Sequence, residues 1–305
     1  MKNILCSGNV SVDIKAYSVE VDDTEAYRDG TIELVPGGVG RGMAINLKHL
    51  GMNTYIHSVV GKDIFGEYLR NGLNEEGVNT SLLGESPERK TALFSVMASR
   101  GKSATCIYST QILREITFDK KVEKFIEDNQ ISAIALDSNL SEEALESFYK
   151  YKMKHPEIFV FQNATAPDIA RKTMKYAGLI DLFGCNEFEA AAILGESSVI
   201  PDLNTADKFQ ALGYKNFIIT FGGQGVMVRI GKDTWNEPPY TPSQIIDTIG
   251  AGDAFASGFL MGFLENDPVK LCIHYGLACA KETLLTRQTV SDRLSKDFLT
   301  KYQVK

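Results

Sequence analysis

The sequence predicts an α/β fold in which helices cover a mainly parallel sheet, with a small β-sheet inserted as a lid. Three observations predict this fold class. Short apolar runs alternate with helical patterns of ten to fifteen residues, the order that parallel strands require. Two segments interrupt the alternation, and one of them carries a hairpin pattern. From Asp253 onward the pattern is helical.

The first elements follow from apolar spacing. Residues 4–7 form a short apolar run typical of a buried strand, and apolar residues recur at helical spacing through 62–76. In chain order we expect strands at 4–7, 54–60, 131–136, 158–161, 179–183 and 217–220, and helices at 40–50, 62–76, 142–152, 167–176, 187–194, 205–212, 254–264, 269–285 and 295–301.

The interrupting segments are residues 17–36 and 90–108. The second reads as two alternating strands joined at residues 99–102, where glycine supports a tight turn. We expect lid segments at about 15–36 and 90–110, inserted in a single domain over residues 1–305. Such a lid would cover a site and exclude water; an edge hairpin without functional motion is the alternative.

Composition and charge restrict the classes of function. The 305 residues include 39 acidic and 32 basic side chains, and the net charge of −7 argues against binding nucleic acid or an anionic membrane through bulk charge. No apolar run approaches the ~18 residues of a spanning helix, and the N-terminal residues show no signal-peptide pattern. The five cysteines include no CxxC pair, so we expect neither a structural zinc site nor a disulfide framework. We expect a cytoplasmic protein.

The strongest chemical signal is Gly250-Ala251-Gly252 followed by Asp253 and an apolar helix. Small residues let backbone N–H groups approach an anion, and the helix N-terminus adds positive potential at the same place. Asp253 is placed to accept a proton from a hydroxyl group during phosphoryl transfer. The alternative is that Asp253 only caps the helix.

Two further motifs follow predicted strands. Thr220 to Gly225 is a glycine-rich turn, suited either to contact with phosphate or ribose or to a β-hairpin. Asn186 and Glu189 open a predicted helix on one face, suited either to water-bound Mg²⁺ or to a helix cap.

Near the N-terminus, Gly37 and Gly38 precede the helix that carries Arg41 and Asn46. Consecutive glycines allow a polar ligand to lie against bare backbone, and Asp13 can supply a carboxylate for sugar hydroxyls. A tight turn with Asp13 simply exposed to solvent is the alternative.

Together these segments resemble the ribokinase-like, phosphofructokinase-B-type family of carbohydrate and nucleoside kinases, in the same order along nearly the whole chain. The resemblance is most specific from Asp247 through Gly258. One family position differs: the asparagine expected after Arg41, which contacts sugar hydroxyls in the family, is Gly42, and Asn46 lies one helical turn further on.

The resemblance implies a three-layer α/β/α fold with a β-sheet lid and ATP-dependent phosphorylation of a hydroxyl. It makes Asp253 the general base and places charge stabilisation at Gly250, Ala251 and Gly252. The remaining implied roles are substrate binding by Asp13, Gly37, Gly38, Arg41 and Asn46; ATP binding by Asn186, Thr220, Gly222, Gly225 and Gly252; Mg²⁺ held through water by Glu189; and a monovalent cation (K⁺) at the backbone carbonyls of Asp247 and Ile249.

Within the family, the residues from Pro36 to Gly51 are most similar to those of pseudouridine kinases, although Tyr108, Ser109 and Thr110 stand where those kinases tend to have an acidic residue. The alternatives are a ribose- or fructose-type sugar and a catalytically weakened ligand-binding protein. Dinucleotide chemistry is not expected, because the glycine motif it requires does not follow the first strand. We also expect a homodimer through the lid, with apolar residues at Leu93, Val96, Ala98 and Ile107.

Overall fold

The structure is a computed structural model that describes residues 2–18, 29–99 and 105–302. Its larger sheet has nine strands. They are β1 (Asn3–Ser7), β4 (Asn53–Gly61), β5 (Asn79–Ser86), β8 (Ala133–Asp137), β9 (Phe159–Asn163), β10 (Leu182–Asn186), β11 (Asn216–Thr220), β12 (Val226–Ile230) and β13 (Asp233–Glu237). Their spatial order is β13-β12-β11-β10-β9-β8-β1-β4-β5. All neighbours pair in parallel except β11 with β12 and β12 with β13, so the sheet is mainly parallel, as predicted.

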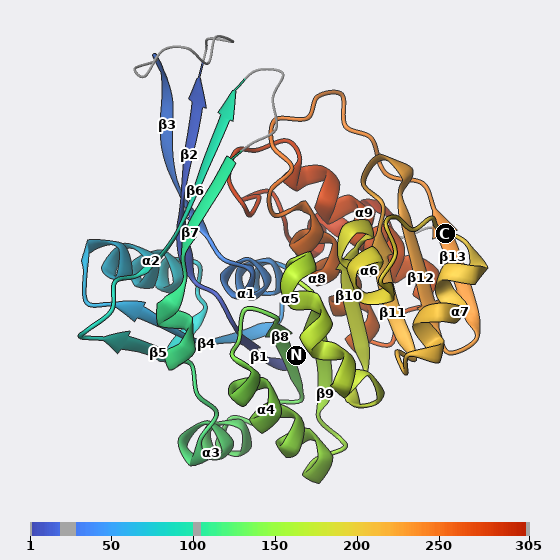
Figure 1. Ribbon diagram of the computed structural model, residues 1–305, viewed down its shortest axis with the longest axis horizontal. Coiled ribbons are helices and arrows are strands. Elements are labelled where there is room, and N and C mark those ends of the chain that lie inside the picture. Colours follow the sequence, from blue (N-terminus) through green and yellow to red (C-terminus); the bar gives the residue numbers. More distant parts are fainter. Residues whose placement is uncertain (1, 19–28, 100–104, 303–305) are drawn as a thin grey trace.

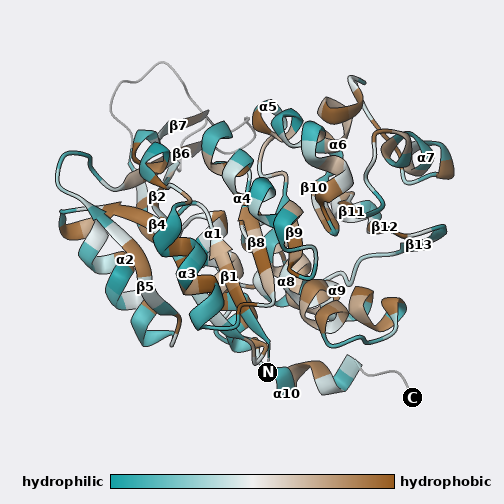
Figure 2. Cartoon of the chain, turned by 90° about the horizontal axis from the view of Figure 1, so that it is seen from below, coloured by the Kyte–Doolittle hydropathy of each residue, from teal (hydrophilic) through white to brown (hydrophobic). Residues whose placement is uncertain are grey.

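Helices cover both faces of this sheet, which confirms the three-layer prediction (Figure 1). Successive side chains of β1 alternate between the two core clusters: Ile4 and Cys6 belong to one and Leu5 to the other. Helices α1 (Val39–His49), α2 (Ile64–Glu75), α8 (Ala251–Leu264) and α9 (Val269–Thr283) contribute to the first cluster, and α3 (Lys120–Asp128), α4 (Glu142–Lys154), α6 (Glu187–Leu194) and α7 (Leu203–Ala211) to the second. Hydrophobic residues are concentrated along central strands such as β8 (Figure 2).

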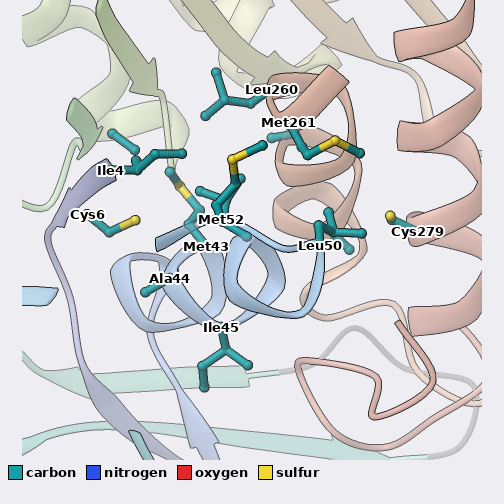
Figure 3. Packing of buried hydrophobic residues seen from close by; sticks show 14 of the residues in the cluster. Ile4, Cys6, Met43, Ala44, Ile45, Leu50, Met52, Leu260, Met261 and Cys279 are labelled. Atoms are coloured by element: carbon teal, nitrogen blue, oxygen red, sulfur yellow. The ribbon is translucent and has the colours of Figure 1, made fainter. Parts of the chain in front are cut away.

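The packing of α1 against α8 positions the functional region. Met43 and Leu50 are fully buried beside Leu260 and Met261 of α8 (Figure 3). Burial of each such side chain contributes about 1.5–3 kcal/mol relative to exposure, which fixes the two helices against each other. As a result their first turns lie side by side, and a Cβ added at Gly42 would lie 3.5 Å from Oδ2 of Asp253.

The lid is a separate four-stranded sheet that projects from the layered body (Figure 1). Strands β6 and β7 pair antiparallel, which confirms the predicted hairpin; beyond Ser99 its expected turn lies outside the described residues, as do residues 19–28 of the first expected lid segment. The strands are β2 (Ser11–Ser18), β3 (Gly30–Gly37), β6 (Ala92–Ser99) and β7 (Thr105–Ser109), in the order β3-β2-β6-β7.

Several elements differ from expectation. The expected helix at 167–176 is only α5 (Pro167–Ala170) followed by the 3₁₀ helix η2 (Arg171–Leu179), where the Thr173 hydroxyl donates to the Ala170 carbonyl. The strand expected at 179–183 is present as β10 but starts three residues later, because η2 continues to Leu179 and the ladder with β9 begins at Leu182. Strands β5 and β13 and helix α3 were not expected. The remaining short helices are η1 (Gln111–Glu115), η3 (Gly222–Gln224), α10 (Lys296–Leu299) and η4 (Thr300–Tyr302).

Candidate active site

A cavity of about 580 Å³ lies between the lid and the carboxyl ends of the central parallel strands. Asn163, Asn186 and Thr220, which end β9, β10 and β11, all line it. This edge is where open α/β sheets bind ligands. The predicted site residues that line the cavity are Asp13, Gly38, Asn186, Glu189, Thr220, Ile249, Gly250, Gly252 and Asp253.

Asp253 lies in the first turn of α8, facing this cavity. The helix cap is Gly250 and no side chain bonds to it, so the interpretation of Asp253 as the cap was wrong. Its Oδ1 instead accepts a hydrogen bond from Nδ2 of Asn163 at 3.0 Å. The carboxylate is therefore oriented by a residue at the end of β9 rather than used to cap its own helix.

The surroundings of Asp253 raise its pKa to about 8. Removal from bulk water is the largest cause, and the charge of the neighbouring Asp137 adds to it, whereas the hydrogen bond from Asn163 acts in the opposite direction. A carboxyl group with a pKa in this range exchanges its proton near neutral pH. That property suits a group that must accept a proton during turnover.

The turn before α8 requires glycine for two different reasons. Gly250 has φ 87°, and a Cβ added to it would lie 2.1 Å from the Thr289 carbonyl oxygen, so a larger residue would be strained. A Cβ added at Gly252 would meet nothing within 4 Å, so Gly252 leaves open space at the cavity wall. Because the first turn of a helix has no intrahelical acceptors for its N–H groups, this turn can receive an anion. Ala251 lies between them but does not line the cavity.

Asp13 is buried on the lid face that looks onto the cavity, so the interpretation of Asp13 as simply exposed was wrong. Burial raises its pKa to about 6, against the opposing charges of Lys15 and Arg41. Gly37 supports it, because a Cβ there would lie 2.1 Å from Oδ1 of Asp13. Gly37 thus does not line the cavity but makes room for the carboxylate, whereas Gly38 lines the cavity directly.

Asn186 and Glu189 form a capping box at the start of α6 and also line the cavity. The Asn186 side chain accepts from the Phe188 and Glu189 N–H groups, and Glu189 accepts from the backbone N–H and the side-chain amide of Asn186. Burial raises the pKa of Glu189 to about 7. The cap and the cavity-facing carboxylate are therefore the same feature.

The glycine turn after β11 is a hairpin turn, because β11 and β12 pair antiparallel around it. Thr220 lines the cavity, but Gly222 and Gly225 do not. Glycine is needed at position 225 for a structural reason, because φ is 96° and an added Cβ would lie 2.1 Å from the Glu237 carbonyl oxygen. Nucleotide binding by these two glycines stays a prediction.

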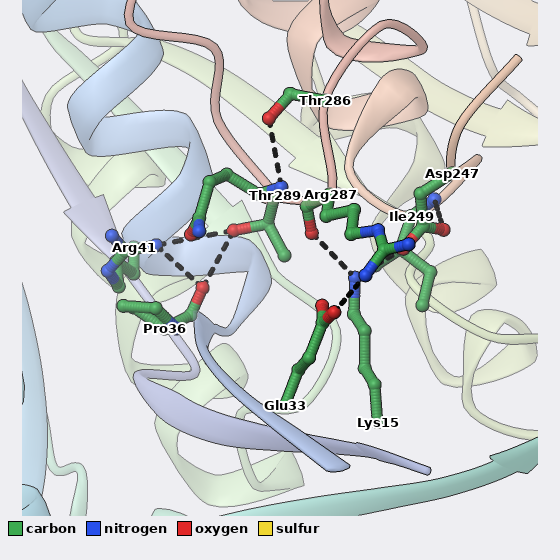
Figure 4. Close-up of polar contacts among 10 residues, drawn as sticks. Lys15, Glu33, Pro36, Arg41, Asp247, Ile249, Thr286, Arg287 and Thr289 are labelled. Carbon is green, nitrogen blue, oxygen red and sulfur yellow. Dashed lines mark hydrogen bonds and ion pairs between the residues drawn. The ribbon is translucent and has the colours of Figure 1, made fainter. Parts of the chain in front are cut away.

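Arg41 and Asn46 do not reach the cavity. The buried Arg41 guanidinium donates to the Pro36 carbonyl at 2.9 Å and contacts the Thr289 hydroxyl at 3.3 Å, beside a second cavity of about 330 Å³ (Figure 4). Asn46 is fully buried, and within the described structure its side-chain amide has no hydrogen-bond partner. The position that faces Asp253 is Gly42.

A polar network that the sequence patterns did not predict lies behind Asp253. Asn163 both bonds to Asp253 and accepts from the Thr165 N–H, and Thr165 in turn donates to Asp137 at 2.8 Å. Asp137 is fully buried and also accepts from the Asn9 and Asn139 N–H groups. A polar residue at the end of a buried strand was the available signal at both Asn163 and Asp137.

The lid contributes an aromatic pair. Phe94 and Tyr108 stack with ring centroids 6.2 Å apart and an interplanar angle of 6°, and both line the cavity. They lie beside Asp13 on the same face of the lid, in one row across three strands, since Asp13 pairs with Phe94 and Phe94 with Tyr108. The lid therefore presents a flat apolar surface beside a carboxylate.

The region expected to bind a monovalent cation contains a lysine. Asp247 accepts from the Ile249 N–H through Oδ1 at 3.0 Å and from Nζ of Lys15 through Oδ2 at 2.5 Å (Figure 4). Ile249 lines the cavity, but Asp247 does not. No sequence motif predicted a role for Lys15.

All five cysteines are free thiols. Within residues 2–18, 29–99 and 105–302, no helix combines the length and the apolar character needed to span a membrane. In the same described ranges, no group of three or more histidine, cysteine, aspartate and glutamate side chains is arranged to hold a metal ion.

Known proteins resemble this chain over nearly its full length. The family described as pfkB family carbohydrate kinase matches residues 1–296. Pseudouridine kinase from Escherichia coli K12 is 27% identical over 299 residues, covering 96% of this chain and 93% of that protein. Ribokinase from Bacillus subtilis is 23% identical over 276 residues, covering 90% of each. The solved structure of Arabidopsis thaliana ribokinase complexed with ribose and ATP has a TM-score of 0.83 at 17% identity, covers 100% of both chains and shows the ribokinase-like fold. The chain therefore belongs to the pfkB family of carbohydrate kinases, phosphotransferases that act on an alcohol group.

Proposed function

We propose that this kinase transfers the γ-phosphate of ATP to a hydroxyl group of a C-nucleoside, with pseudouridine as the first choice of acceptor. One observation carries the proposal: a single cavity is lined by Asp253, by the glycine turn at Gly250 and Gly252, and by the aromatic pair of the lid. These are a base, an anion site and a surface for a planar ring. The similarity to a pseudouridine kinase supports the same choice.

In the proposed reaction the acceptor hydroxyl oxygen forms a bond to the γ-phosphorus while the bond from that phosphorus to the bridging oxygen breaks, and ADP leaves. Asp253 takes the hydroxyl proton. Gly250, Ala251 and Gly252 supply backbone N–H groups at the start of α8 that stabilise charge on the transferring group. Catalysis by positioning and charge stabilisation suits phosphoryl transfer, which needs little covalent help from the protein.

For the nucleotide, we propose contacts from Asn186, Thr220, Gly222, Gly225 and Gly252. The residues present also suit Mg²⁺: Glu189 and Asp253 are hard oxygen donors, both line the cavity, and their charges repel each other. Glu189 would hold Mg²⁺ through water. Mg²⁺, when bound, would neutralise charge on the phosphates.

For the acceptor, Asp13 and Gly38 are the proposed direct contacts, because both line the cavity. Gly37 acts by making room for Asp13. Arg41 acts indirectly, by fixing the Pro36 carbonyl at the base of the lid. The predicted role of Asn46 as a substitute for the family asparagine has no support in the cavity lining, since the side chain is buried away from it.

Phe94 and Tyr108 favour a nucleoside over a free sugar. A nucleobase presents a π-face that stacks on aromatic side chains, with about 1–3 kcal/mol per base in nucleic-acid complexes. Ribose and fructose have no such face. A ribose- or fructose-type kinase is nevertheless the second candidate, because Asp13 is placed to accept hydrogen bonds from sugar hydroxyls whether or not a base is attached.

The test is ADP release with Mg-ATP across pseudouridine, uridine, adenosine, ribose and fructose. We expect turnover of pseudouridine, a loss of ~10³-fold in Asp253→Asn, and in Phe94→Leu a KM that rises about fivefold for the nucleoside but not for a free sugar. Turnover of free sugars alone would show that the acceptor is a sugar and not a nucleoside, and would leave the proposed mechanism unchanged. Intact ATP binding without turnover of any acceptor would favour a weakened ligand-binding member.

We also propose a homodimer through the lid. Its outer face, opposite Asp13, exposes Ile32 by 73%, Ile107 by 72%, Met97 by 60% and Leu34 by 54%. A contiguous apolar face of this kind is typical of an interface. Of the residues expected there, Val96 pairs with Lys15 and so lies on the inner face, Leu93 is half-buried, and the side chain of Ala98 is outside the described set.

Light scattering at micromolar concentration should give the mass of a dimer, and Ile107→Lys should give a monomer. A monomeric wild type would contradict the proposal. The cytoplasm is the proposed location, because free thiols persist in reducing compartments.

A further inference from the structure

Lys15 is a buried cation beside the active site. It lies on β2, 1% exposed, and Nζ donates to Oδ2 of Asp247 at 2.5 Å and to the Arg287 carbonyl oxygen at 3.0 Å (Figure 4). Because side chains alternate along a strand, Lys15 points to the same side of the lid as Asp13. One lid strand thus delivers the carboxylate and the ammonium group to neighbouring positions.

The acceptors of Lys15 are oxygens of the kind that bind a hard cation, a carboxylate and a backbone carbonyl. The family resemblance places a monovalent cation at the backbone carbonyls of Asp247 and Ile249. The residues present do not fit a second cation there, since the Lys15 ammonium group is already bound to the side chain of the same Asp247 and to the Arg287 carbonyl. A second positive charge beside this ammonium group would be repelled, because like charges at short range interact unfavourably near a protein surface.

Lys15 is connected to the anion-binding turn through one residue. Asp247 holds the ammonium group with Oδ2 and the Ile249 N–H with Oδ1. Ile249 directly precedes Gly250, and both line the cavity. The charge and the hydrogen bonds of Lys15 therefore act on the turn that would bind the transferred phosphoryl group.

We infer that the Lys15 ammonium group replaces the dissociable monovalent cation of the family, so that this enzyme works without K⁺. A tethered cation is always present at its site, whereas a free ion must be bound from solution. For its effect on turnover the inference rests on the proposed kinase function. Its structural part, one cation site already filled by the chain, stands without that function.

The activity test compares K⁺ with tetramethylammonium, a much bulkier cation, at equal ionic strength. Wild type should change less than twofold. Lys15→Ala opens the site, and should lose at least tenfold in tetramethylammonium and recover severalfold in K⁺ or NH₄⁺. Lys15→Met removes the charge but keeps most of the volume, and should lose activity without recovery.

The matched control is Arg287→Gln. It removes an exposed neighbouring positive charge that pairs with Glu33, but keeps the backbone carbonyl that contacts Lys15. It should resemble wild type in both salts. Cation dependence in this control would show that net charge near the loop, rather than the Lys15 ammonium group, sets the response, and would overturn the inference.

Thermal unfolding gives a readout that needs no turnover. A ligand that binds only the folded state raises Tm. K⁺ should therefore raise the Tm of Lys15→Ala relative to tetramethylammonium and leave that of wild type unchanged. If wild type turns over no acceptor, the proposed function fails, and these Tm values still test the cation site.

Two further results would overturn the inference. One is wild type that needs K⁺ for activity or is stabilised by it, which would show that an ion binds despite Lys15. The other is Lys15→Ala that responds to K⁺ in neither assay, which would make Lys15 only a clamp between the lid and the Arg287 loop. Should Lys15→Ala fail to fold, the wild-type comparison decides alone.

Discussion

Nδ2 of Asn163 donates a hydrogen bond to Oδ1 of Asp253 at 3.0 Å, and so links the end of β9 to the first turn of α8. A hydrogen bond to an ionised carboxylate is worth about 1.5–3 kcal/mol. Asn163→Ala should therefore lower kcat/KM about 10- to 100-fold and move the rising limb of the pH profile to higher pH, because the bond holds the pKa of Asp253 down.

The control for Asn163 is Asn139→Ala. Asn139 follows the neighbouring strand β8 and also lines the cavity, but its side-chain amide bonds to Asp137 instead of Asp253. Its pH profile should keep the wild-type midpoint. An unshifted profile in Asn163→Ala would contradict the positioning role.

The pH dependence of turnover follows from the pKa of Asp253, about 8. The base must be ionised to take a proton, so kcat/KM should rise tenfold per pH unit below the midpoint and level off above about pH 8. Initial rates between pH 6 and 9.5 at subsaturating acceptor measure this. A plateau that already begins at pH 5 would contradict a raised pKa in the free enzyme.

The free energy of unfolding should fall with rising pH, whereas kcat/KM rises. Between the ordinary pKa of 3.8 and about 8, folded Asp253 holds a proton that the unfolded chain has lost, so its contribution to the free energy of unfolding falls as pH rises through this window. Asp253→Asn is neutral throughout. Its Tm should therefore exceed that of wild type by an amount that grows from pH 5 to 9; a constant difference would argue against the shift.

Gly250 and Gly252 should respond differently to alanine. Gly250→Ala meets the Thr289 carbonyl oxygen at 2.1 Å at φ 87°, so it should lower stability by more than ~1 kcal/mol. Gly252→Ala meets nothing within 4 Å and lies inside α8, so it should raise stability by about 0.5–1 kcal/mol. Its methyl group nevertheless lies where the phosphoryl group would approach. Denaturant unfolding and ADP release together should show a stable but weakly active Gly252→Ala; full activity would remove the anion site from this turn.

Gly42→Asn should fold, because the added Cβ lies 3.5 Å from Oδ2 of Asp253, an ordinary contact. Asparagine also suits a helix slightly better than glycine. The new amide should lower the KM for the acceptor severalfold, the effect of one added hydrogen bond of about 1 kcal/mol. Gly72→Asn, on α2 with nothing within 4 Å of the added Cβ, is the control. An unchanged KM in Gly42→Asn would show that position 42 does not contact the acceptor.

Local patterns made much of the fold and part of the site predictable. Strands alternate with helices because helices bury both faces of the sheet. The apolar run at residues 3–7 and the similar runs of the neighbouring strands make this burial visible in the sequence. Gly250 and Asp253 were predictable because turn, helix start and carboxylate lie within four residues. Strand β13 was not, since this edge strand, Asp233–Glu237, has no buried residue.

The missed residues share a different property. Asn163 is 90 residues from Asp253 in the sequence, and Lys15 is 232 residues from Asp247. No local spacing pattern can therefore predict either contact. Arg41 follows the glycine pair as the family pattern expects, yet the face of α1 that it occupies is set by packing against the loop at Thr289. Side-chain direction on a helix depends on tertiary contacts that sequence spacing does not contain.

The contacts of the lid with the C-terminal loop have a consequence for synthesis on the ribosome. Lys15 bonds to Asp247 and Arg287, and Arg41 to Thr289, so the N-terminal strands find their partners only after nearly the whole chain has been translated. Closing such long loops is costly in entropy and slow. A nascent chain can build β1, β4 and β8 early, but the phosphoryl site would assemble last, and C-terminal truncation before residue 289 should abolish it entirely.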